Sequence, residues 1–262
     1  MLFSHYDRYQ YARSPLVEVI CQLRFPTILS IGANVPADFQ DAVRQEFPLF
    51  NKVQEHPAPK MTTVDGKPKM VQPDLITNYT FISEDHLWKL NLTQSFIALS
   101  TLRYQRWEDF AQRLDRPLAQ FIQIYRPAFF ERVGLRYVNA FSRRALGLEG
   151  TPWSDLIQPA FLGVMAEPDV DERAVGKCSL DVSMALDAGR KMKVHAGPGL
   201  LGGGKQDKEA KFILDGDFSA AGNIAPDQVA SGLEDLHYHA VRLFRGALTS
   251  ELHTAMGAQP LV

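Results

Sequence analysis

Polar and apolar residues alternate along the segment from Leu16 to Phe25. Its odd-numbered residues are apolar, whereas Glu18, Gln22 and Arg24 place polar groups at even positions. A period of two is the repeat of a β-strand, and it gives this strand one apolar face and one mixed face. Because Pro26 follows directly, the pattern predicts a strand over residues 16–25 that packs its apolar face on a core.

Periodicity also predicts elements in the rest of the chain. Two long segments, 107–125 and 227–256, repeat their apolar residues every three to four positions, which is the period of an amphipathic helix. Pro117 lies inside the first of them and predicts a kink or a division into two helices. The remaining apolar segments predict strands at 77–83, 86–92, 96–102, 129–141, 177–186, 192–195 and 212–218, and short helices at 36–47 and 153–157.

The order of these elements repeats. Strand, short helix, antiparallel strands and long helix follow one another in residues 1–126 and again in residues 127–262. This layout predicts an α+β protein, one compact unit of two similarly ordered halves, whose antiparallel sheet has long helices packed on one face. Helix-grip and TATA-binding-protein-like folds share the element order, an analogy of shape that carries no function. If the halves meet about a pseudo-twofold axis, strands 16–25 and 130–141 are neighbours at the centre of the sheet.

Residues 51–73 interrupt the pattern. They are poor in large apolar residues and rich in Pro, Lys and Thr. Such a composition predicts a ragged edge strand or a loop that contacts a partner. Because an edge strand presents unpaired backbone groups, pairing between two chains through this region would give a homodimer.

Composition excludes several classes of protein. The 262 residues are 45% hydrophobic and 22% charged, which excludes a disordered chain, and the net charge of −2 lacks the basic excess of most nucleic-acid-binding proteins. No apolar segment approaches the length of a membrane span, and residues 1–14 lack the apolar core of a signal peptide. Cys21 and Cys178 lie in apolar, strand-like segments and predict buried thiols. We therefore expect a protein of the reducing cytoplasm with no membrane contact.

Charged residues on the mixed faces of the two central strands form the candidate site. Glu18 and Arg24 share a face of the first strand, and Arg132 and Arg136 share a face of the second. A charge buried without a partner costs several kcal/mol, so these residues must pair or face a polar cavity. Guanidinium groups bind carboxylates and phosphates, so the functional interpretation is a site for a small anionic ligand in which Glu18 orients the arginines. A structural Glu–Arg network or a solvated face is the alternative.

Three functional hypotheses follow. The first is a non-enzymatic module that binds a ligand or a protein partner on the sheet face or between the sheet and the long helices. The second is a hydrolase or nuclease that uses strand carboxylates such as Glu18 and Asp181. The third is a nucleic-acid-associated accessory or defence protein, which needs a local basic stripe. No motif implies a cofactor or a metal, and the residues favour binding over catalysis.

Two motifs with known chemistry have simpler interpretations. The segment from Gly199 to Gln206 has the glycine and lysine spacing of a phosphate-binding loop, but glutamine stands where Ser or Thr would hold Mg²⁺, and a strand follows. It predicts a glycine-rich hairpin loop. Glu234 and His237 have the helical spacing of di-iron proteins, but the second copy of the motif that such a site needs is lacking. We expect His237 to border the core with its ring bonded to a neighbour.

Turn signals and aromatic residues are interpreted structurally as well. Asp215 and Asp217 flank Gly216 and predict a turn or the end of a strand. Aromatic residues of the first meander and the segment after it predict packing between sheet and helix rather than a surface for stacking bases. They are Tyr79, Phe81, Trp88, Phe96, Tyr104 and Trp107.

Several patches of the sequence resemble a known family. They are Pro15–Phe25, the Phe39-Gln40 helix with Phe47-Pro48, Phe81–Asp85, Tyr104–Trp107, Arg132–Asn139 and the closing helix from His237 to Thr249. Together they resemble a sporadically distributed family of bacterial proteins of about this length, which has no established activity. The resemblance covers nearly the whole chain and consists of strand and helix patches, not a catalytic motif. It implies a globular bacterial protein encoded among accessory genes, and it implies no functional residue.

Overall fold

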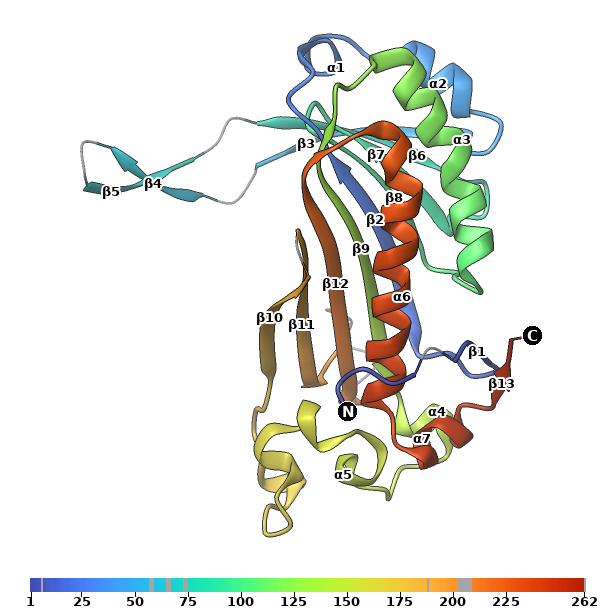
Figure 1. Cartoon of the computed structure of the whole chain (residues 1–262), viewed down its shortest axis with the longest axis vertical. Coiled ribbons are helices and arrows are strands. Elements are labelled where there is room, and N and C mark those ends of the chain that lie inside the picture. Colours follow the sequence, from blue (N-terminus) through green and yellow to red (C-terminus); the bar gives the residue numbers. More distant parts are fainter. Residues whose placement is uncertain are drawn as a thin grey trace.

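The computed structural model describes residues 1–5, 7–56, 59–64, 67–72, 75–187, 189–201 and 209–261. Its main feature is a nine-stranded sheet with the strand order β10-β11-β12-β9-β2-β8-β7-β6-β3, in which neighbouring strands are antiparallel. Strands β2 (Leu16–Arg24) and β9 (Phe130–Phe141) lie side by side at its centre (Figure 1). The predicted α+β class and the pairing of these two strands are confirmed.

The sheet extends from this central pair with the same connectivity on both sides. In each half the first strand pairs with the last strand of the meander that follows it. One side comprises β8 (Phe96–Thr101), β7 (Trp88–Leu92), β6 (Ile76–Ile82) and β3 (Leu49–Glu55). The other comprises β12 (Lys211–Ile224), β11 (Arg190–Gly199) and β10 (Leu180–Asp187).

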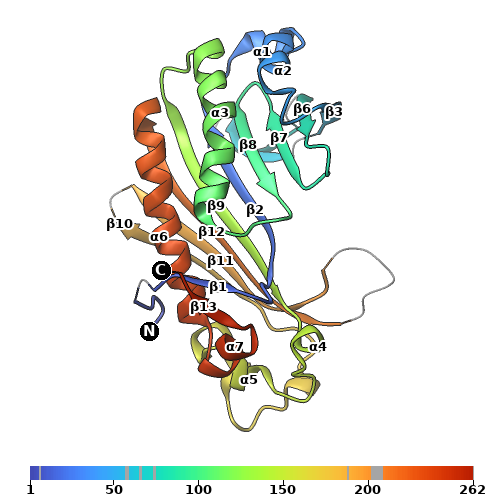
Figure 2. The same ribbon diagram turned by 90° about the vertical axis from the view of Figure 1, so that its right-hand side faces the viewer.

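Two long helices cover one face of the sheet (Figure 2). Helix α3 (Trp107–Tyr125) has the predicted bounds and continues through Pro117, so of the two expected alternatives, a kink or a division, the division into two helices is wrong. Helix α6 (Val229–Ala247) is shorter than predicted, because the backbone at Leu248 is extended and Thr249 caps a separate helix, α7 (Ser250–Ala255). The single helix expected over 227–256 is therefore two.

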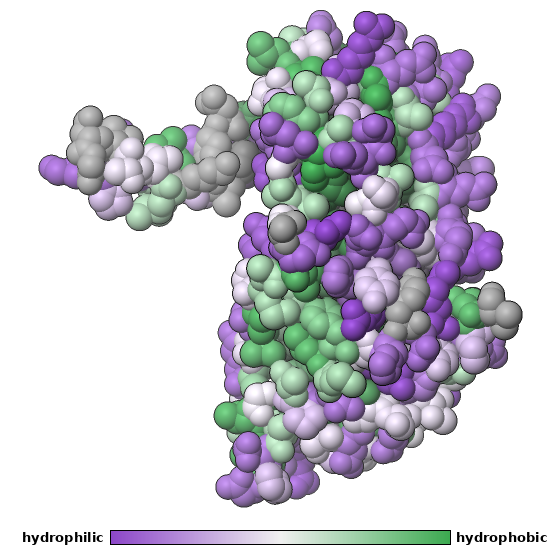
Figure 3. All heavy atoms as spheres, viewed as in Figure 1, coloured by the Kyte–Doolittle hydropathy of each residue, from purple (hydrophilic) through white to green (hydrophobic). Residues whose placement is uncertain are grey.

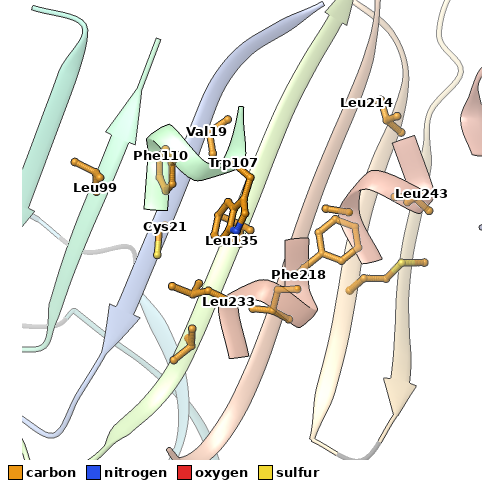
Figure 4. Close-up of a cluster of buried hydrophobic side chains, with 14 of the residues drawn as sticks. Val19, Cys21, Leu99, Trp107, Phe110, Leu135, Leu214, Phe218, Leu233 and Leu243 are labelled. Atoms are coloured by element: carbon orange, nitrogen blue, oxygen red, sulfur yellow. The ribbon is translucent and has the colours of Figure 1, made fainter. Parts of the chain in front are cut away.

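The core lies between this helical layer and the apolar sheet face (Figure 4). Alternate residues of the central strands point into it, as the period of two predicts. The opposite face of the sheet has no helical layer in either view. Buried core residues include Val19, Cys21 and Leu23 of β2, Val133 and Leu135 of β9, Phe110, Leu114 and Phe121 of α3, and Leu233, Leu236 and Leu243 of α6.

Short elements connect these layers. The edge strand expected within 51–73 is β3, and a separate hairpin of β4 (Lys60–Val64) and β5 (Lys67–Val71) extends away from the sheet (Figure 1). The first half also contains α1 (Leu29–Ala33) and α2 (Ala37–Val43), which is shorter than the helix expected at 36–47. The second contains α4 (Arg143–Leu146), α5 (Trp153–Leu156) and four 3₁₀ turns at 159–161, 163–166, 172–174 and 226–228.

The two ends of the chain meet beside α6 (Figure 2). Strand β1 (Tyr9–Tyr11) pairs antiparallel with β13 (Ala258–Pro260). The residues before β1 run along α6, where the Ser4 N–H donates to the Arg242 carbonyl and Arg242 Nε donates to the Ser4 carbonyl. The chain ends thereby form one wall of the site described next.

Candidate functional site

The four candidate residues lie on the sheet face opposite the helices. Arg24 of β2 stands directly opposite Arg132 of β9, and Arg136 stands opposite Ile20. Glu18 is two residues from Ile20 on the same face. The central strand pair therefore brings the four residues onto one face, in two neighbouring strands.

The two arginines of β9 form ion pairs with acids of β12. Arg132 Nη2 lies 2.6 Å from Asp217 Oδ1, and Arg136 Nη2 lies 2.5 Å from Asp215 Oδ2. Hydrogen bonding to Asp215 raises the pKa of Arg136, to which the more distant charge of Glu18 also contributes. These acids lie in the middle of β12, so the prediction that they mark a turn or a strand end is wrong. The alternation of the strand continues through the glycine between them.

Gly134 gives Arg132 the space to reach Asp217. A Cβ atom added at Gly134 would lie 2.1 Å from Arg132 Nη1, so the guanidinium lies directly over this glycine. A side chain at residue 134 would occupy the path of the arginine along the sheet. The Arg-x-Gly-x-Arg pattern of β9 is thus explained by the packing of one ion pair.

We expect Gly134→Val to lower the free energy of unfolding by about 1–3 kcal/mol, because it displaces Arg132 and leaves Asp217 without its charged hydrogen bonds. Urea denaturation measures the change. In an Arg132→Ala background the same substitution meets no guanidinium and is expected to be neutral or stabilising, since valine favours strands over glycine. An equal loss in both backgrounds would contradict this role of Gly134.

Charges of opposite sign alternate across the open face of the second half. From β9 outward, Arg136 is followed by the acids of β12, then by Lys193 and His195 of β11, and then by Asp181 of β10. The Oδ1 atom of Asp181 lies 2.9 Å from His195 Nδ1. A shallow depression of about 350 Å³ lies over these strands, and Arg136 is the only one of the four candidate residues in its lining. Mutual neutralisation of these charges leaves little attraction for an anion.

The carboxylates named for hydrolysis do not converge. Glu18 lies on β2 and Asp181 on β10, and three strands separate them. With strands about 4.8 Å apart, the two lie roughly 19 Å from each other, too far to act on one bond. Among the described residues, no group of three or more His, Cys, Asp or Glu side chains is arranged to hold a metal ion.

A larger cavity, of about 570 Å³, lies on the other face, between the sheet and α6. Its volume falls within the usual range for small-molecule sites. The segment 7–16 and the segment 102–107 close its sides. The lining includes many aromatic and arginine side chains: Tyr9, Tyr11, Tyr104, Trp107, Tyr137, Phe218, Phe244, Arg8, Arg103, Arg106 and Arg245.

His237 of α6 also lines this cavity and is held from two sides. The ring of Trp107 stacks on the imidazole, with centroids 4.7 Å apart and planes inclined by 10°. The hydroxyl of Tyr137 lies 2.8 Å from His237 Nδ1. One turn earlier on α6, Glu234 Oε1 accepts a 2.5 Å hydrogen bond from Trp107 Nε1. The two residues of the Glu-x-x-His motif thus contact one indole ring: Glu234 bonds its N–H and His237 stacks on its face. The prediction that His237 borders the core with its ring bonded to a neighbour is confirmed.

The second ring nitrogen of His237, Nε2, has no hydrogen-bond partner among the described residues. The residue is 4% exposed, and Nε2 is buried without a hydrogen bond from any residue that the structure describes. Burial, together with the positive charge of Arg8, lowers the pKa of His237 to about 3, so the imidazole is neutral at physiological pH. If Nδ1 accepts a hydrogen bond from the Tyr137 hydroxyl, Nε2 carries the ring proton. If Nδ1 carries the proton and donates it to that hydroxyl, Nε2 has a free lone pair.

One arginine of the lining is free to bind an anion. Arg8 is paired with Glu108 at 2.7 Å and Arg106 with Asp109 at 2.8 Å. Arg103 lies 3.6 Å from Asp85 in the turn between β6 and β7. Arg245 has no ion pair or side-chain hydrogen bond within the described ranges of the chain.

Among the described residues, no carboxylate forms an ion pair with Arg245, although Asp7 lies in the lining of the same cavity. Burial raises the pKa of the neighbouring Tyr11 to about 12, so this tyrosine is neutral and does not compensate Arg245. Burial also lowers the pKa of His253, with Arg245 as a second cause. The Tyr11 hydroxyl lies 3.1 Å from His253 Nδ1. Within the described part of the chain, the cavity therefore combines a guanidinium without an ion pair, several aromatic walls and one carboxylate, that of Asp7.

The N-terminal segment crosses α6 at a glycine. A Cβ atom at Gly246 would lie 2.2 Å from the Leu2 carbonyl oxygen, so this close approach requires glycine. Further along, the N–H of Ala12 donates to the Gly257 carbonyl. These contacts fix the segment that closes the cavity.

Other predictions fall outside the cavity. Residues 202–208, which contain most of the possible phosphate-binding loop, lie outside the described residues. Cys21 is buried, which raises the pKa of its thiol to about 12, and Cys178 is half-buried with its Sγ donating to the Leu162 carbonyl. Of the helices in the described ranges, none has the length and apolarity needed to cross a bilayer.

Tyr137 and Arg245 are residues of this cavity that the sequence pattern did not single out. Tyr137 was included only as part of a strand, because nothing in its pattern indicates a bond to a histidine one hundred residues later. Arg245 carried a detectable signal, since it lies four residues after Val241 and three before Leu248 and so interrupts the apolar side of a helix. The chain matches no protein-family model and no curated protein. A functional conclusion must therefore come from the geometry of the site.

Proposed function

We propose that the protein is a non-enzymatic binding module for a small organic anion with a planar apolar body, held in the cavity between the sheet and α6. The observation that carries this proposal is the guanidinium of Arg245, which has no ion pair among the described residues and lies in an aromatic-lined cavity of ligand size. A volume of about 570 Å³ accommodates a small organic molecule.

The walls favour a planar apolar body. Trp107 and Tyr104 come from the segment at the start of α3, and Tyr137 and Phe218 come from the sheet. Aromatic side chains give an inserted ring large contact areas in stacked or edge-to-face arrangements. Such contacts supply affinity, whereas the few polar groups fix the orientation of the ligand.

Arg245 favours a negative charge on the ligand. Its guanidinium is not neutralised by a carboxylate in the described residues, and it lies at the same cavity as His237. A guanidinium binds a carboxylate or sulfonate through charge-assisted hydrogen bonds. On the open face, by contrast, Arg132 and Arg136 already bind Asp217 and Asp215. The cavity is therefore a better anion site than the sheet face.

Calorimetric titration with 2-naphthoate tests the proposal, with the nearly isosteric neutral 2-naphthamide as the matched ligand. We expect 2-naphthoate to bind one site per chain and the amide to bind at least about ten-fold more weakly, because the amide lacks the charge that Arg245 binds. Arg245→Gln is expected to reduce binding of 2-naphthoate by about ten-fold or more and to leave binding of the amide unchanged.

Arg24→Gln is the matched control. It removes an arginine that, within the described ranges, also has no ion pair and lies on the opposite face of the sheet, and it is expected to leave both affinities unchanged. No binding of 2-naphthoate to the folded protein would contradict the proposal. Loss of binding in Arg24→Gln instead of Arg245→Gln would move the site to the open face.

A further inference from the structure

Strand β10 is an open edge of the sheet. It pairs with β11 on its inner side and, among the described residues, with no strand on its outer side. The strand spans Leu180–Asp187, is regular up to Ala185 and has an irregularity between Ala185 and Asp187, and its outer edge presents a row of unpaired backbone N–H and C=O groups. Such an edge is a template for pairing with another strand.

The two faces of β10 differ in chemistry. Leu180, Val182, Met184 and Leu186 are half-buried, whereas the residues between them are exposed. The apolar residues continue the core face of the sheet, next to the buried Val194 of β11. Helix α6 packs on β12 and β9 and leaves this stripe partly open. In Figure 3 hydrophobic side chains gather over β10 and β11 in the same region.

We propose that β10 pairs antiparallel with β10 of a second copy of this chain, so that two nine-stranded sheets become one across a two-fold axis. Pairing would satisfy the backbone groups of both edges and bring the two apolar stripes into contact. The sequence of the strand determines whether such a symmetric pairing is compatible with its charges.

Only one register of substantial overlap suits the side chains. Directly opposed residues in an antiparallel pair share a face, so a symmetric pairing is centred on one residue. Centred on Ser183, it places Leu180 opposite the partner's Leu186 and Val182 opposite the partner's Met184. On the other face, Asp181 lies opposite the partner's Ala185. No like charges meet in this register.

The neighbouring registers are less favourable. Centring on Met184 places Asp181 opposite the partner's Asp187 twice, and like charges directly opposed destabilise a sheet. Centring on Val182 shortens the overlap to residues 180–184. The strand is therefore self-complementary about Ser183, which identifies a second copy of the chain as the partner. This inference is independent of the ligand cavity.

The mass in solution is the first test. Light scattering after size-exclusion chromatography is expected to give twice the 29.4 kDa of the chain for the unmodified protein. Val182→Lys places a cation opposite the partner's Met184 and is expected to give the mass of a single chain, with thermal unfolding confirming that the variant is folded. A single-chain mass for the unmodified protein at about 100 μM would overturn the proposal.

Cysteine cross-linking tests the register without depending on that variant. Under mild oxidation Ser183→Cys is expected to form a covalent dimer, because the two thiols would lie directly opposite each other at a distance a disulfide can span. The exposed Ala185→Cys on the same face is the matched control and is expected to remain uncross-linked, as is the unmodified protein with its own two cysteines. A dimer that persists in Val182→Lys and lacks the Ser183→Cys cross-link would refute β10 pairing and indicate the opposite edge, β3.

Discussion

Trp107→Ala is expected to lower the free energy of unfolding by about 3–5 kcal/mol, which is the range for removing a large aromatic side chain from a core. The indole is 4% exposed and stacks on His237 and Phe110. Its removal also eliminates the hydrogen bond that Trp107 Nε1 donates to Glu234 Oε1. Urea denaturation measures the loss, which would be a large part of the total stability of a typical domain.

Trp107→Phe separates the contributions of the ring and the N–H. It keeps an aromatic face against His237 and loses the donor to Glu234, so we expect a smaller loss of about 1–2 kcal/mol. If Trp107→Ala cost less than about 1 kcal/mol, the indole would not be the buried centre that joins α3 to α6.

The stability of the protein is expected to fall as the pH is lowered below 6.5, in part because of His237. Its pKa is about 3 in the fold and 6.5 in the unfolded chain, so between these values only the unfolded chain takes up the proton. The contribution is fully present above pH 6.5 and is lost progressively toward pH 3. Two pH units of this range, from 6.5 to 4.5, correspond to about 2–3 kcal/mol.

Two variants isolate this contribution. His237→Phe keeps a ring against Trp107 and removes the titrating group. The free energy of unfolding lost between pH 7 and pH 4.5 is therefore expected to be about 2–3 kcal/mol smaller in this variant than in the unmodified protein. Tyr137→Phe removes the hydrogen bond to Nδ1 but keeps the buried imidazole, so it is expected to retain the pH dependence. The charges nearest His237, Arg8 and Glu108, stay in place in both variants. An unchanged pH dependence in His237→Phe would contradict the assignment.

The elements that the sequence predicted well are those with a strong, uninterrupted period. Strand β2 and helix α3 each bury one face, so their polar and apolar positions follow the geometry of the backbone. The pairing of β2 with β9 also followed from the order of elements, because each half begins with a strand of this kind. For β2, β9 and α3 the polar and apolar pattern of the sequence therefore agrees with the observed fold, because each of them buries one face.

Other elements were mispredicted for identifiable physical reasons. Apolar spacing continues past Ala247, but Thr249 accepts a hydrogen bond from the N–H of Leu252 and starts a new helix. Asp215-Gly216-Asp217 looks like a turn, yet it lies mid-strand. There the two acids pair with arginines, and a Cβ at Gly216 would lie 2.9 Å from the ring of Phe218. In both cases a tertiary or capping contact overrides the local signal.

The cavity could not be derived from sequence spacing. Trp107, Tyr137 and His237 are separated by tens of residues and meet only because α3, β9 and α6 pack together. Their residue types are those of an ordinary core, so composition does not distinguish them. The sequence pattern instead indicated a candidate site at the charged residues of β2 and β9. The structure adds the acids of β12 that neutralise the arginines of β9.

A crystal structure of the protein grown with 2-naphthoate tests the central claim most directly. We expect the naphthalene ring inside the cavity between the sheet and α6, against its aromatic walls, and the carboxylate within hydrogen-bond distance of Arg245. Naphthoate seated on the open face beside Arg24 and Arg132, with the cavity empty of ligand, would contradict it.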